Sequence, residues 1–61
     1  MDKEQLKQTL EYIKGGATLE RIAKKYKMNL RTFHRKLKPF KKDIKLARNY
    51  YQMVVERMFN S

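Results

Sequence analysis

Apolar residues recur every three or four positions in successive stretches of this 61-residue chain, a spacing that predicts an all-helical protein. In the first stretch Asp2 is the expected N-cap, and Gln5 three positions later completes a capping-box pattern. Gly15-Gly16 is expected to end this helix, because glycine tolerates the left-handed conformation found past a helix C-terminus. Its apolar face comprises Leu6, Leu10 and Ile13, flanked by Tyr12.

Two short helices of about eight residues are expected next, with Thr18 and Asn29 as their N-caps. Glu20 lies favourably for the dipole of the first of these helices. A connection of about three residues is too short for an ordinary hairpin and predicts two steeply crossed helices, as in a helix-turn-helix. The small side chain of Ala23 would let the two helices approach closely. The predicted core between them consists of Ile22, Tyr26, Met28, Phe33 and Leu37, with Leu19 on the inner face of the first of these helices. For Leu30 core packing is expected, and an outward contact is the alternative.

Pro39 is expected to end the third helix, because proline disfavours helical geometry at the preceding residue, Lys38. A fourth helix should begin between Pro39 and Asp43 and run to about Asn60. The predicted fold is thus all-α and a single domain over residues 1–61. It has a three-helix, homeodomain-like helix-turn-helix core, with the motif at 18–38, and a long C-terminal helix at about 41–60.

The fourth helix carries apolar residues on more than one side, which predicts burial on more than one side. One stripe is expected to pack on the three-helix core: Ile44, Ala47, Tyr51, Val54 and Met58. A second group would be exposed on a monomer and predicts a homodimer interface: Leu46, Tyr50, Met53 and Phe59. The alternative is one four-helix core that buries both groups.

The formal net charge of +10 is concentrated in the middle of the chain. Residues 21–42 contain ten of the sixteen lysines and arginines and none of the six acidic residues. A block of one sign inside a domain predicts a binding face for a polyanion. The alternative, a merely solvated surface, would normally intersperse both signs.

The chain lacks the residues that several classes of function require. The chain has no cysteine and only one histidine, His34, so disulfides and structural zinc sites are not expected. There are no paired carboxylates, no glycine-rich phosphate loop and no activated nucleophile, so we expect no enzyme activity, no cofactor, no metal and no small-molecule ligand. Met1 is followed by a polar stretch rather than a signal peptide, and no segment reaches the ~20 apolar residues of a membrane span. A soluble, cytoplasmic and nucleoid-associated protein is expected.

The stretch "TLERIAKKYKMNLRTFHRKLK" resembles the helix-turn-helix of serine invertases and resolvases, insertion-element transposases and phage terminase small subunits. The residues in register with their pattern are Ile22-Ala23, Tyr26, Met28, Thr32-Phe33-His34-Arg35 and Leu37. The stretch departs from the pattern at Lys27, where glycine is usual, and at Asn29, where serine is common. The segment after it, through Phe59, resembles the helix that follows this motif in phage-encoded proteins.

A third helix displaying Arg31, Thr32, His34, Arg35 and Lys38 would fit a DNA major groove. The resemblance implies that Arg31 and Arg35 face base edges and that Thr32 and His34 approach phosphates; His34 is open to either role. The expected base contacts are Arg31, Arg35, Asn29 and His34. The expected phosphate contacts are Thr18, Lys24, Lys27, Thr32, Lys36, Lys38, Lys41, Lys42 and Lys45.

These features together predict a homodimeric, sequence-specific double-stranded-DNA-binding protein, a small transcriptional regulator of phage or mobile-element type. The alternatives are the DNA-recognition module of a terminase small subunit, or a recombination accessory factor. A protein-interaction module that reuses the fold is a further alternative. Membrane binding is not expected, because the positive residues of the fourth helix cluster in its first half.

Overall fold

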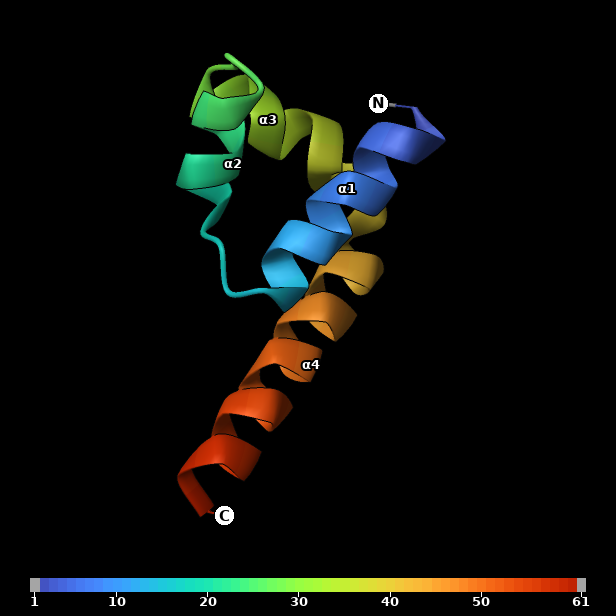
Figure 1. Cartoon of the computed structure of the whole chain (residues 1–61). Coiled ribbons are helices and arrows are strands. Elements are labelled where there is room, and N and C mark those ends of the chain that lie inside the picture. The colour runs from blue at the N-terminus through green and yellow to red at the C-terminus, as the bar shows by residue number, and fades with distance from the viewer. Residues whose placement is uncertain (1, 61) are drawn as a thin grey trace.

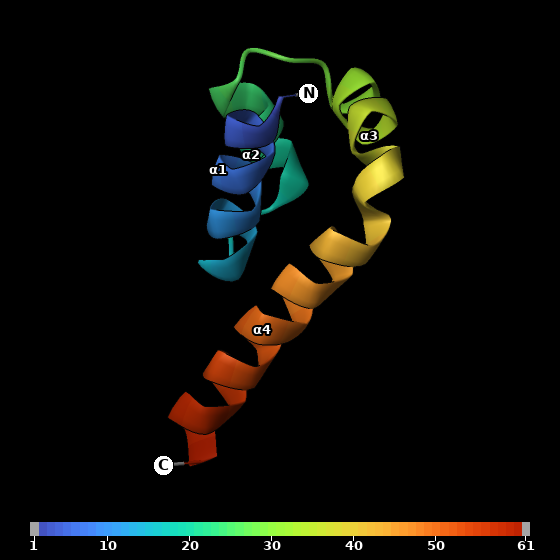
Figure 2. The ribbon, with the colours of Figure 1, turned by 90° about the vertical axis from the view of Figure 1, so that its right-hand side faces the viewer.

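The computed structural model describes residues 2–60, which form four α-helices and one short 3₁₀ helix without a strand (Figure 1). The elements in chain order are α1 (Lys3–Lys14), α2 (Leu19–Lys25), α3 (Leu30–Leu37), η1 (Lys38–Phe40) and α4 (Lys41–Asn60). The first three helices gather at one end of the molecule, and α4 extends away from them as a rod (Figures 1 and 2). The prediction of an all-helical chain is confirmed.

The three predicted N-caps are confirmed by side-chain hydrogen bonds to backbone N–H groups of the first helical turn. Asp2 Oδ1 accepts from the Gln5 N–H at 2.8 Å, and Thr18 Oγ1 accepts from the Arg21 N–H at 3.2 Å. Asn29 Oδ1 accepts from the Arg31 N–H at 2.8 Å. These bonds satisfy donors that have no partner within the helix, and so they fix where α1, α2 and α3 begin.

Two Schellman motifs end α1 and α2 with the same backbone pattern. After α1, Gly16 has a φ of 93°, and Ala17 donates back to the Tyr12 carbonyl at 3.0 Å. After α2, Lys27 has a φ of 54°, and Met28 donates to the Ala23 carbonyl at 2.8 Å. The left-handed residue of such a motif is usually glycine. Lys27 stands where the resembling motifs have glycine, and it therefore carries the steric cost of a side chain at a left-handed position.

The core lies where α1, α2, α3 and the first half of α4 meet. Its buried apolar residues are Ile13, Ile22, Ala23, Phe33, Leu37, Ile44 and Ala47. Ala23 is only 2% exposed, as its predicted place between α2 and α3 requires. Leu30 corrects the sequence prediction: it is 38% exposed rather than in the core, because it begins α3 at the margin of the cluster.

Thr9 is a buried polar residue that the apolar pattern did not reveal. It is fully buried, whereas its neighbours Leu6 and Leu10 are only partly covered. Its hydroxyl donates to the Gln5 carbonyl at 2.7 Å and lies 3.2 Å from the Tyr26 hydroxyl. Thr9 thus links α1 to the end of α2 by a polar contact inside the core.

The junction between α3 and α4 is helical throughout, which corrects the expectation for Lys38. Lys38 has right-handed helical geometry (φ −52°, ψ −44°) despite preceding Pro39. The backbone tightens into η1, where Pro39 occupies a first-turn position that needs no N–H donor. The predicted start of α4 between Pro39 and Asp43 is confirmed at Lys41.

The first half of α4 packs on α1 and the second half does not (Figure 1). Ile44 and Ala47 of the predicted stripe are buried. Tyr51, Val54 and Met58 are exposed, so the prediction that the whole stripe packs on the core is wrong. The physical reason is length: α4 has 20 residues and α1 only 12, so α1 cannot cover its far half.

We predict that Lys27→Gly stabilises the fold by about 0.5–1 kcal/mol, since glycine takes a positive φ without a Cβ clash. Lys24→Gly is the matched control, because it removes the same charge from within α2 and should destabilise by about 1 kcal/mol. Urea unfolding followed by circular dichroism measures both. A destabilised Lys27→Gly variant would contradict the strain assigned to this turn.

We predict that Gly16→Ala destabilises the fold by about 1–2 kcal/mol. A Cβ at Gly16 would lie 2.6–3.0 Å from three atoms of the Tyr51 side chain, and the backbone there is left-handed. Gly15→Ala is the control: its Cβ meets nothing closer than 3.5 Å, and its φ is −84°. That variant should be neutral or more stable by up to about 1 kcal/mol in thermal unfolding. Equal effects of the two substitutions would refute the close approach of Tyr51.

Candidate nucleic-acid interface

The outward face of α3 is polar and positively charged. Phe33 and Leu37 are buried, and the residues between and around them are exposed: Arg31, Thr32, His34, Arg35, Lys36 and Lys38. Arg31 and Arg35 are one helical turn apart and therefore share one side of α3. The predicted outward face of this helix is confirmed.

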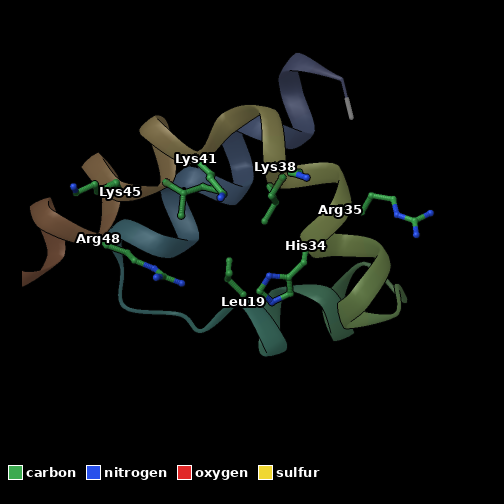
Figure 3. Close-up of a pocket in the computed structure, with 9 residues that line it drawn as sticks. Leu19, His34, Arg35, Lys38, Lys41, Lys45 and Arg48 are labelled. Atoms are coloured by element: carbon green, nitrogen blue, oxygen red, sulfur yellow. The ribbon is translucent and has the colours of Figure 1, made fainter.

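A hollow of about 710 Å³ lies beside this face, between α2, α3 and α4 (Figure 3). Its apolar lining comes from three helices, through Leu19, Leu37 and Ile44. Leu19 follows the N-cap of α2, Leu37 ends α3 and Ile44 lies one turn into α4. The hollow is therefore a product of the fold, and no single helix could form it.

Six further side chains line the hollow, and each has a basic group: His34, Arg35, Lys38, Lys41, Lys45 and Arg48. No acidic residue is among the lining residues. The ion pair between Lys14 and Glu11 (3.8 Å) lies on α1, outside the hollow. Clefts lined by one sign of charge concentrate the field and attract ions of the opposite sign. We name these six residues the basic rim.

The members of the basic rim point in different directions (Figure 3). The His34 ring and the Arg48 side chain reach from opposite sides of the hollow towards Leu19. Arg35 points away from the hollow, towards the outward face of α3. The hollow and the Arg31–Arg35 side of α3 are thus adjacent surfaces that an extended anion could meet together.

The structure brings together some of the predicted contacts and separates others. His34, Arg35, Lys38, Lys41 and Lys45 meet at the hollow. The remaining predicted contacts are exposed but do not line it: Thr18, Lys24, Lys27, Asn29, Arg31, Thr32, Lys36 and Lys42. Of these, Thr18 and Asn29 use side-chain oxygens as helix caps. The Asn29 amide nitrogen is then the group suited to a base contact.

Arg48 is the rim residue that the sequence analysis missed. The signal was its spacing: Lys41, Lys45 and Arg48 recur at i, i+4 and i+7 and share one face of α4. That face turns towards α3 because Ile44 and Ala47 dock α4 on the core. Helical spacing alone did not reveal that α3 would lie opposite this face of α4.

Comparison with known proteins gives no relative for this chain: no protein family, no curated protein and no solved structure matches it. Among residues 2–60, no helix is long and apolar enough to cross a membrane. The same residues contain no cluster of histidine, aspartate or glutamate suited to a metal ion. The function of this protein can therefore be inferred only from its own residues and their arrangement.

Proposed function

We propose that this protein binds double-stranded DNA through a helix-turn-helix formed by α2, residues 26–29 and α3. Two short helices of seven and eight residues joined by a tight, capped turn support this assignment. Buried Ala23 at their contact supports it as well. In such a motif the second helix enters the major groove, so α3 is the proposed recognition helix.

The observation that carries the proposal is the basic rim. Six basic residues from α3, η1 and α4 line one concave surface that has no acidic residue in its lining. Arg35 points from it towards the exposed Arg31–Arg35 side of α3. DNA presents a regular row of phosphates beside each groove, and lysines and arginines that neutralise them supply most of the affinity. The rim suits a phosphate row flanking the groove that α3 occupies.

The two basic surfaces then have separate roles in the proposed complex. Arg31 and Arg35 would read bases, because an arginine can donate two hydrogen bonds to guanine. Lys38, Lys41, Lys45 and Arg48 would hold phosphates, which fixes orientation without reading sequence. The resemblance of residues 18–38 to mobile-element proteins suggests a small transcriptional regulator as the biological role. We propose no catalytic activity.

We predict that the affinity for duplex DNA falls steeply as salt rises. About five phosphate contacts per subunit give a slope of log K against log salt of about −4 or steeper. Fluorescence anisotropy with a labelled duplex over a range of salt concentrations measures this slope. Affinity that hardly changes between low and moderate salt would refute the proposal.

The structure distinguishes two adjacent lysines for a test of the basic rim. Lys41 lines the hollow, whereas Lys42 does not, although the two are neighbours on α4. We predict that Lys41→Gln makes the salt slope shallower by about 1, because one phosphate contact is lost, and that Lys42→Gln leaves it unchanged. Arg48→Gln should behave like Lys41→Gln. Equal effects of the two lysine substitutions would show that phosphates do not follow the hollow.

We predict that Arg35→Ala loses about 1–3 kcal/mol of binding free energy on the preferred site and much less on random duplex. Lys41→Ala should weaken both duplexes by the same factor. Selection from a random duplex pool first defines the preferred site, and competition binding then compares the two variants. If Arg35→Ala weakens both duplexes equally, α3 is not the helix that reads bases.

A further inference from the structure

From Leu46 onward, α4 leaves large apolar side chains in water. Leu46 is 66% exposed, Met53 49% and Phe59 85%, and Tyr50 and Val54 are exposed as well. Single exposed apolar residues are ordinary, but several on one helix that projects from its domain mark an interaction surface. A helical segment that has little packing against its domain is also only marginally stable in water.

Four of these residues form a continuous surface. Leu46, Tyr50, Met53 and Val54 follow i, i+4, i+7 and i+8 spacing, which places them along one side of α4. The Lys14 ammonium lies over the Tyr50 ring at 5.5 Å, so the end of α1 lies beside this surface. We name these four residues the distal face.

The charge distribution indicates what covers the distal face. Residues 49–60 contain one acidic residue and one basic residue, Glu56 and Arg57, so the whole net charge of +10 lies before residue 49. An acidic partner would be drawn to that basic part. An anionic bilayer would require basic residues along the full polar side of the helix. A second copy of this chain is not acidic, so it is not drawn to the basic part. It also needs no basic residues along the helix, because a neutral, apolar contact is enough to hold it.

We propose that a second copy of this chain covers the distal face, with the two α4 helices packed antiparallel along their distal faces about a twofold axis. The same residues then face each other across the axis, as a closed twofold dimer requires. The antiparallel arrangement keeps the two basic parts at opposite ends, where their repulsion is smallest. Repulsion would oppose any pairing that overlaps residues 21–42.

The dimer fixes a length for the DNA site, and this part of the inference depends on the proposed function. The described Cα atoms extend 38 Å along the longest axis. A twofold axis that pairs Leu46 with Val54 of the second copy overlaps the two α4 helices over nearly their whole length, about 30 Å. Twice the single length less this overlap is about 46 Å. The two α3 helices are then closer than two turns of DNA, roughly 70 Å, which leaves half-sites one turn apart.

Sedimentation equilibrium at micromolar concentration tests the dimer without DNA. The wild-type chain should have twice its 7.5 kDa mass. Met53→Glu, which places a carboxylate on the distal face, should have the mass of one chain. Gln52→Glu adds the same carboxylate one residue away on the opposite side of α4 and should remain a dimer. Circular dichroism and thermal unfolding confirm that both variants are folded.

A wild-type mass of one chain at all concentrations would overturn the proposal, and so would a Met53→Glu variant that is still a dimer. In the first case the distal face belongs to another partner. If Met53→Glu does not fold, Leu46→Glu takes its place and should also have the mass of one chain, because Leu46 belongs to the distal face and is 66% exposed.

Duplexes that carry two selected half-sites test the spacing. Wild-type protein should bind half-sites with centres 10–11 base pairs apart roughly 100-fold more tightly than half-sites 21 base pairs apart. Met53→Glu should lose this preference while still binding a single half-site, and Gln52→Glu should keep it. Tighter binding at 21 base pairs would overturn the antiparallel geometry. Loss of binding at every spacing, with the dimer mass intact, would instead reject the DNA-binding proposal alone.

Discussion

The contact between Phe33 and Tyr26 holds the domain together. Phe33 is the largest fully buried side chain, and its ring meets the Tyr26 ring edge-on at a centroid distance of 6.0 Å. Tyr26 also lies 6.5 Å from the Tyr12 ring, and its hydroxyl reaches buried Thr9. One aromatic series thus joins α3, α2 and α1, and edge-to-face pairs of this kind add to the free energy of simple burial. The position of α3, and hence of every side chain it displays, depends on this series.

Much of the fold follows from local sequence rules. Asp2, Thr18 and Asn29 could be recognised as N-caps because capping is a contact within four residues. The strain at Lys27 could be inferred because the turn pattern demands a left-handed residue there. Thr9 could not be recognised, since its burial depends on Tyr26, 17 positions away. Lys38 could not be predicted either, because the 3₁₀ geometry of η1 depends on how both flanking helices pack.

The sequence predicted that the candidate interface would be basic, but it predicted less well which residues form it. Charge counting along the chain identified residues 21–42 as the basic region, and that region supplies Arg35, Lys38 and Lys41 to the hollow. Arg48 was missed because it lies further beyond the basic block than Lys45 and joins the others only through the docking of α4. Lys24, Lys27, Lys36 and Lys42 belong to the block but not to the hollow. The basic residues of the block and the basic residues that line the hollow are therefore overlapping but different sets.

The helical junction at η1 has a mechanical consequence. No loop separates α3 from α4, so residues 30–60 form one bent arm, and rotation of one helix against the other would require breaking backbone hydrogen bonds. In the proposed complex this arm transmits the angle of the helix pairing directly to the base-reading helix. Each base pair inserted between half-sites rotates one of them by about 35° about the duplex axis. A stiff arm cannot absorb that rotation, so in the proposed complex the protein would respond to the phase of its target as well as to its sequence.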